Sequence, residues 1–204
     1  MTERTRLEGR LPVGAIDTRA SGWWAMIFTV FTEASLFAYL LFSYYYIAVQ
    51  PHLPGTFPQG GAPDMALALP NTVILLLSSV AVGWAQLGIE HGNKWRLTAG
   101  LGIGALLGLV FLVLQYFEWA QKPFTLASSP YASLYFTITG FHMAHVVVGF
   151  FMLLALTWWS GHGYFNKVRY AHIHIGALYW HFVDAVWLAV FFTFYITPLL
   201  GLRA

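Results

Sequence analysis

Residues 179–187 have the sequence Tyr-Trp-His-Phe-Val-Asp-Ala-Val-Trp, and residues 140–145 have the sequence Gly-Phe-His-Met-Ala-His. Both stretches place ionisable side chains inside long apolar runs, and Glu33 does the same in the first apolar run of the chain. In a membrane such residues are rare and costly, so they face a packed interior and find partners there. The three runs therefore predict an all-α, polytopic membrane protein with a polar interior.

The composition of the chain agrees with this class. Of its 204 residues, 58% are hydrophobic and only 9% are charged, whereas about a quarter of the residues in a soluble domain are charged. The chain has no cysteine, which excludes disulfides and thiolate metal ligands. The formal net charge of +2 is too small to indicate a nucleic-acid partner.

Five apolar runs are long enough for membrane-spanning helices, each of which needs about 20 residues. The runs are Trp23–Val49, Leu67–Ile89, Leu97–Trp119, Tyr131–Trp159 and Ile175–Leu200. Segments with proline, glycine and charged residues separate them. We therefore expect five transmembrane helices over residues 23–204, preceded by a polar amino-terminal arm over residues 1–22.

The basic residues indicate how this bundle is oriented. Most of them fall on one side, in the arm and in the second and fourth loops: Arg4, Arg6, Arg10, Arg19, Lys94, Arg96, Lys167 and Arg169. Only Lys122 and Arg203 fall on the other side. Because Lys and Arg are enriched in cytoplasmic loops, we expect a cytoplasmic amino terminus and an external carboxyl terminus.

The histidines allow two interpretations. His142 and His145 are i, i+3 neighbours on one helix, as are His181 and Asp184. One interpretation is ligation of a metal or a haem, with Asp184 orienting a ligand histidine. The other is that the imidazoles form hydrogen bonds between helices. Only Glu33 is deep enough to add a carboxylate, so we favour the second interpretation and expect no metal site.

Glu33 is predicted to lie near the membrane midplane, about 15 Å past Trp23 at a rise of about 1.5 Å per residue. It is either a carboxyl group that relays protons or a structural acid, and the sequence leaves both open. In either role a buried carboxyl group needs a partner. We expect a direct or water-mediated hydrogen bond to His142 or His145, which lie at a similar depth.

Two further sets of residues are predicted to organise the bundle. The first is a polar layer toward the outer side, formed by Asn71, Gln115 and Glu118. The second is a stripe of small residues on the third helix, formed by Gly100, Gly104 and Gly108. Such a stripe predicts close packing on a neighbouring helix, and a substrate path is the alternative.

Several short motifs follow one another in a recognisable order. They are Thr32-Glu33-Ala34-Ser35, Leu69-Pro70-Asn71-Thr72, Gln115-Tyr116-Phe117-Glu118-Trp119 with Pro123-Phe124-Thr125, residues 140–149 and residues 179–187. Together they resemble subunit III of the haem–copper oxidases, the cytochrome c oxidase subunit 3 family, from Trp23 to the end. The chain resembles a short form that lacks the two amino-terminal helices. It departs from the family pattern at Met143, where glycine is usual, and at His174, where an acid is common.

The resemblance implies a non-catalytic subunit of a respiratory, proton-translocating oxidase that itself binds no haem or copper. The implied partners are the catalytic subunit I and subunit II, which hold the haems and copper, together with phospholipids and other respiratory complexes. It also implies a two-plus-three arrangement, with phospholipid in a cleft between the first two helices and the last three. By resemblance, Glu33, His142, His145, His181 and Asp184 support structure and proton uptake, in a bacterial cytoplasmic membrane.

Three alternatives stay open at this point. The chain is also consistent with subunit III of a quinol oxidase, or with an accessory subunit of a nitric-oxide reductase. The third alternative belongs to a different class of protein, a membrane cytochrome that holds haem between His142 or His145 and His181.

Overall fold

The computed structural model describes residues 21–51, 57–58, 65–166 and 170–199. Its elements are α2 (Ser21–Ala48), α3 (Met65–Glu90), α4 (Lys94–Gln121), α5 (Pro130–Gly161), α6 (Ala171–Phe191), a π-helical turn η1 (Phe192–Ile196) and α7 (Thr197–Leu199). Over these residues every regular element is helical, and five helices are long and apolar enough to cross a membrane. The predicted all-α bundle with five spans is confirmed.

Part of the orientation argument falls outside these residues. Most of the amino-terminal arm, including its four arginines, lies there, as do Lys167, Arg169 and Arg203. Within the described residues, Lys94 and Arg96 stand at the start of α4, and Lys122 follows its opposite end. The side of the membrane on which each end lies therefore stays a prediction.

Side-chain caps set the start of two helices. The side chain of Asn93 accepts a hydrogen bond from the backbone N–H of Arg96 at 3.1 Å, which caps α4. Ser129 Oγ accepts from the backbone N–H of Ala132 at 3.1 Å, and Pro130 is the first residue of α5. Such residues satisfy backbone donors that a helix leaves free at its start. The predicted spans were drawn from runs of apolar residues, which leave out the polar caps. Both helices therefore begin before their predicted spans.

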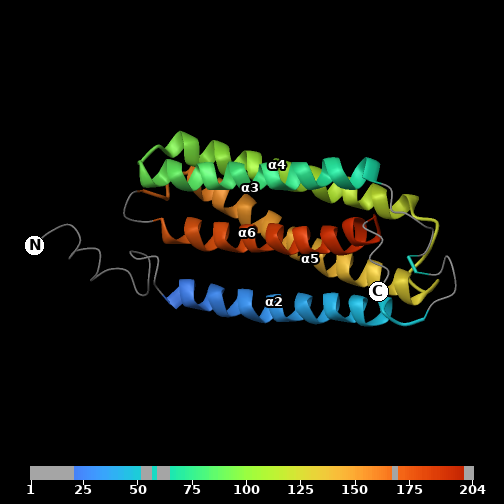
Figure 1. Cartoon of the computed structure of the whole chain (residues 1–204). Helices are drawn as coiled ribbons and strands as arrows, with labels where there is room; N and C mark the ends of the chain where they lie inside the picture. The colour runs from blue at the N-terminus through green and yellow to red at the C-terminus, as the bar shows by residue number, and fades with distance from the viewer. Residues whose placement is uncertain (1–20, 52–56, 59–64, 167–169, 200–204) are drawn as a thin grey trace, which may run out of the picture.

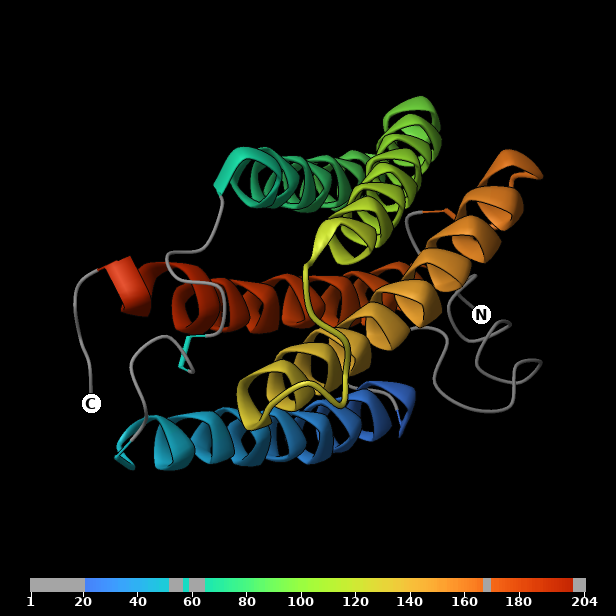
Figure 2. The same cartoon turned by 90° about the vertical axis from the view of Figure 1, so that its right-hand side faces the viewer.

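Each of the five long helices runs in the opposite direction to the long helix before it in the chain (Figure 1). Helices α3 and α4 lie together at one edge of the bundle, α2 lies at the other, and α5 and α6 lie between them. Helix α2 packs on α5 and α6. Figure 2 shows that α5 crosses α6 obliquely. The core is therefore centred on α6, which packs against α2, α3 and α5.

The expected two-plus-three arrangement is wrong. It would place a cleft between α3 and α4, but these two helices form the most extensive helix pair of the bundle. Only His91, Gly92 and Asn93 connect them, and so short a connection makes consecutive helices antiparallel neighbours. The helix that stands apart is α2, which contacts neither α3 nor α4 extensively.

The glycine stripe of α4 explains the closeness of this pair. A methyl group added at Gly100 would lie 2.7 Å from the carbonyl oxygen of Ala81, and one at Gly104 would lie 2.6 Å from Val82 Cγ2. Both distances are shorter than a carbon atom tolerates, so only glycine permits this approach of α4 to α3. Gly100 and Gly104 therefore lie at a close approach of α4 to α3.

Gly108, the third residue of the stripe, faces α6 instead. A methyl group there would lie 2.7 Å from Trp180 Cη2, and one at Gly149 on α5 would lie 2.8 Å from Trp180 Cε3. The Trp180 ring is fully buried between these two glycines. Its indole N–H donates a hydrogen bond to Ser78 Oγ on α3 at 3.0 Å. Trp180 thus joins α3, α4, α5 and α6 in one contact.

Candidate functional site

The pair formed by Glu33 and His145 joins α2 to α5. Glu33 Oε2 lies 3.0 Å from His145 Nε2. The other ring nitrogen, Nδ1, lies 2.7 Å from the carbonyl oxygen of Phe141. Because a carbonyl oxygen only accepts, Nδ1 carries a hydrogen. Nε2 then either accepts from a protonated Glu33 or, in an imidazolium, donates to its carboxylate. The expected bond from Glu33 to a histidine is confirmed, and the partner is His145.

This pair lines a pocket of about 410 Å³ between α2, α5 and α6. Its other lining residues are mainly apolar: Met26, Thr29, Ala144, Val148, Met152 and Tyr179. The Glu33 side chain is 33% exposed and that of His145 is 13% exposed. The pocket therefore has a mainly apolar wall with one ionisable pair in it.

His142 does not join this pair. Its side chain is fully buried and points toward α6, where Nε2 donates to the carbonyl oxygen of Val183 at 3.2 Å. Its ring packs on Trp187 with a centroid separation of 4.8 Å. Although His142 and His145 are i, i+3 neighbours, they bond to different helices. Among the described residues, no group of three or more His, Cys, Asp or Glu side chains could hold a metal ion.

A second group of polar side chains follows the contact between α3 and α6. Ser79 Oγ lies 2.5 Å from His181 Nδ1, and His181 Nε2 lies 3.4 Å from Gln86 Oε1. Gln86 Nε2 lies 3.5 Å from His174 Nδ1. His174 Nε2 lies 3.5 Å from Oε1 of Glu90, an ion-pair distance without the geometry of a regular hydrogen bond.

Asp184 lies at the inner end of this group. Its side chain is buried, the hydroxyl of Ser79 approaches its carboxyl group, and neither carboxyl oxygen has a hydrogen bond of regular geometry. Asp184 therefore does not orient His181 directly, as the ligand interpretation required. The sequence analysis missed Ser79 and Gln86. A signal was available, because Ser79 and Gln86 are seven residues apart, as are His174 and His181, which is about two helical turns.

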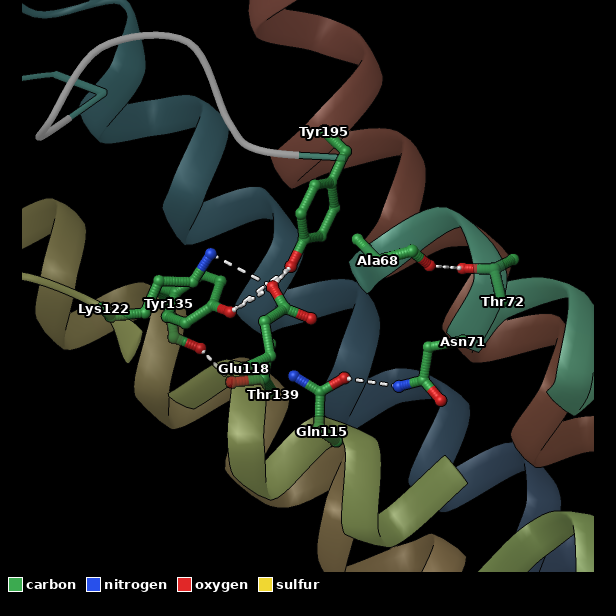
Figure 3. Close-up of polar contacts among 9 residues, drawn as sticks. All are labelled: Ala68, Asn71, Thr72, Gln115, Glu118, Lys122, Tyr135, Thr139 and Tyr195. Carbon is green, nitrogen blue, oxygen red and sulfur yellow. Dashed lines mark hydrogen bonds and ion pairs between the residues drawn. The ribbon is translucent and has the colours of Figure 1, made fainter. Parts of the chain in front are cut away.

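The third group is the outer polar layer, whose side chains come from α3, α4, α5 and η1 (Figure 3). Asn71 Nδ2 donates to Gln115 Oε1 at 3.4 Å. Glu118 Oε1 accepts from Lys122 Nζ at 3.0 Å, from the hydroxyl of Tyr135 at 3.2 Å and from the hydroxyl of Tyr195. Asn71, Gln115 and Glu118 are buried.

The tyrosines of this layer were not predicted. Tyr135 belongs to α5 and Tyr195 to the π-helical turn η1. A π-helical turn shifts the register of the residues that follow, so a regular helix count does not place Tyr195 beside Glu118. With one carboxylate, one ammonium and two phenols in contact, this layer has the features of a structural lock between helices.

Comparison with known proteins identifies the family. A sequence model described as cytochrome c oxidase subunit III matches residues 17–198. The chain belongs to this family. The cytochrome c oxidase subunit 3 of Drosophila melanogaster is 35% identical over 177 residues, which cover 84% of this chain and 68% of the relative. The subunits of Petromyzon marinus and Ovis aries are 35% and 33% identical over the same shares of each chain.

Membership of the subunit III family makes this chain a non-catalytic subunit of cytochrome c oxidase, an oxidoreductase complex. It also confirms the resemblance drawn from the motifs. Subunit III of this oxidase family has no metal site of its own. This favours the oxidase subunit over the alternative of a haem-binding cytochrome.

The comparisons also bear on the membrane in which this subunit III lies. Its five spans and its family support a multi-pass membrane protein. The relatives named above come from animals, so they give no support to the expected bacterial cytoplasmic membrane.

Proposed function

We propose that this subunit supports the catalytic subunit of cytochrome c oxidase by holding phospholipid and by sustaining proton uptake. The observation that carries the proposal is the Glu33–His145 pair in an otherwise mainly apolar pocket. Ionisable side chains inside a membrane bundle are costly and rare, so such a pair is a functional-site hypothesis by default. The proposed partners are subunit I, which contains the haems and copper, and subunit II.

The pocket offers the expected lipid a different site from the cleft predicted between α3 and α4. Since α3 and α4 pack closely, lipid does not lie between them. The pocket between α2, α5 and α6 has the volume and the apolar lining that an acyl chain needs, with Met26, Val148 and Met152 on its walls. We propose that a phospholipid chain lies there, against the Glu33–His145 pair.

The first test replaces Glu33 by alanine in the purified complex. This leaves His145 without its carboxyl partner, so proton supply and subunit association are expected to weaken while the redox centres stay intact. The initial rate of oxygen reduction should equal that of the unmodified complex, and the activity should then decay several-fold faster. Turnover followed over time, together with the haem spectrum, measures both.

Ser43→Ala is the matched control on the same helix, because among the described residues the hydroxyl of Ser43 bonds only to the carbonyl oxygen of Tyr39, at 2.9 Å. Its turnover should decay at the unmodified rate. A Glu33→Ala complex that makes no first turnover, or whose haem bands move, would place Glu33 in the redox chemistry and refute the accessory role.

The second test concerns orientation. Eight basic residues on one side predict a cytoplasmic amino terminus. Reporter domains fused after Gly55 and after Lys167 should then report opposite sides of the membrane, with Gly55 outside. Reporters that agree with one another would refute the five-span topology, and an exchange of the two sides would refute the orientation alone.

A further inference from the structure

Three buried polar atoms of the outer polar layer have no hydrogen-bond partner among the residues that the structure describes. They are Asn71 Oδ1 on α3, and Gln115 Nε2 and Glu118 Oε2 on α4. The exposed fractions of the three residues are 1%, 0% and 4%, so bulk water does not reach these atoms. Nearly all buried polar atoms in native proteins are hydrogen-bonded, and an ordered water is the usual partner where the protein supplies none.

The three atoms belong to side chains that adjoin one another. Asn71 Nδ2 donates to Gln115 Oε1 at 3.4 Å, so the two amide groups are in contact. Gln115 and Glu118 are i, i+3 neighbours on α4, and side chains at this spacing meet on one face of a helix. Figure 3 shows the Gln115 amide between Asn71 and Glu118, with the second carboxyl oxygen of Glu118 turned away from Lys122. One small molecule in this place can therefore reach all three residues.

The unpaired atoms are a set that one water molecule satisfies. Gln115 Nε2 only donates, whereas Asn71 Oδ1 and the carboxylate oxygen of Glu118 only accept. A water molecule has two hydrogens and two lone pairs, so it can donate to both oxygens and accept from the nitrogen. Exchanging the oxygen and the nitrogen of both amides leaves the same set, which is one amide donor, one amide acceptor and Glu118 Oε2.

A metal cation fits this place less well than water does. An amide N–H faces it in either orientation of the amides, and a cation repels such a donor. The negative charge of Glu118 is already paired with Lys122 Nζ at 3.0 Å. Ca²⁺ also takes about 6–8 oxygen ligands, whereas the side chains of Asn71, Gln115 and Glu118 offer two unpaired oxygens.

We propose that Asn71, Gln115 and Glu118 bind one internal water molecule. The water joins the amide pair between α3 and α4 to the carboxyl group that accepts from the tyrosines of α5 and η1. The outer polar layer is thereby one hydrogen-bonded network over four elements. This water site shares no residue with the pocket between α2, α5 and α6, so it does not depend on the proposed function.

Electron cryomicroscopy of the complete oxidase, at a resolution that shows ordered waters, tests this proposal. We expect one peak of density at about 2.7–3.2 Å from Glu118 Oε2 and from an amide atom each of Asn71 and Gln115. Gln115→Leu should remove the peak, because it deletes an amide and puts an apolar group beside the site. Gln86→Leu is the matched control, because Gln86 belongs to the group between α3 and α6, and it should leave the peak in place.

Three results would overturn the proposal. The first is a map of the unmodified complex that shows waters at other buried places of the bundle and none beside Gln115. The second is a peak surrounded by oxygens at about 2.3–2.6 Å, which are the distances of a bound cation. The third is a peak that persists in Gln115→Leu, which means that Gln115 does not hold it. The map of the unmodified complex decides the first two even if Gln115→Leu does not assemble.

Discussion

Replacing Gly108 by alanine is expected to lower the temperature at which this subunit separates from the purified oxidase. The added methyl group would lie 2.7 Å from Trp180 Cη2 and 3.0 Å from Cζ2. The ring has nowhere to move, because it is fully buried, bonded to Ser78 and backed by Gly149. Overpacking of this kind costs about 1–3 kcal/mol, which is a shift of several degrees for a chain of this length. Thermal dissociation of the complex measures it.

Gly83→Ala supplies the matched control. Gly83 also lies inside a long helix, but a methyl group there has nothing within 4 Å. Both changes bring the same gain in helix propensity, about 1 kcal/mol over glycine. Gly83→Ala should therefore leave the dissociation temperature unchanged or raise it. Equal behaviour of the two variants would show that Trp180 is not held tightly between α4 and α5.

The number, type and approximate bounds of the membrane helices could be predicted, because each follows from a local property. An apolar run such as Leu97–Trp119 needs no tertiary partner to show its length. The glycine stripe was equally local, since Gly100 and Gly104 repeat every four residues on one helix face. Polar caps such as Ser129 lie outside these runs, which is why α5 begins earlier than its apolar pattern does.

The arrangement of the helices could not be predicted in the same way. The sequence places Glu33, His142 and His145 at similar depths, but depth does not say toward which helix a side chain points. His142 turns to α6 and His145 to α2, so only one of them meets Glu33. The two-plus-three grouping failed for a similar reason. It was carried over from the family resemblance, whereas the short loop before Lys94 already indicated that α3 and α4 are neighbours.

Replacing Glu118 by leucine should destabilise the outer end of the bundle more than any other single change in the polar layer. The Glu118 side chain is 5% exposed, and one of its oxygens accepts from Lys122, Tyr135 and Tyr195. Without it, an ammonium group and two phenols lose a shared acceptor. Removing one partner of a buried ion pair costs about 3–5 kcal/mol. The low end of that range applies, because Lys122 stands at a helix end and can extend toward water.

A second substitution distinguishes lost pairing from lost packing. In Glu118→Leu with Lys122→Met, no charge is left without its partner, so this double variant should dissociate at a higher temperature than Glu118→Leu alone. Glu118→Gln, which keeps an acceptor oxygen for the two tyrosines, should fall between Glu118→Leu and the unmodified chain. If the double variant is instead as unstable as the sum of its two single variants, Glu118 and Lys122 act independently, and their ion pair adds nothing to the bonds by which Tyr135 and Tyr195 join α5 and η1 to α4.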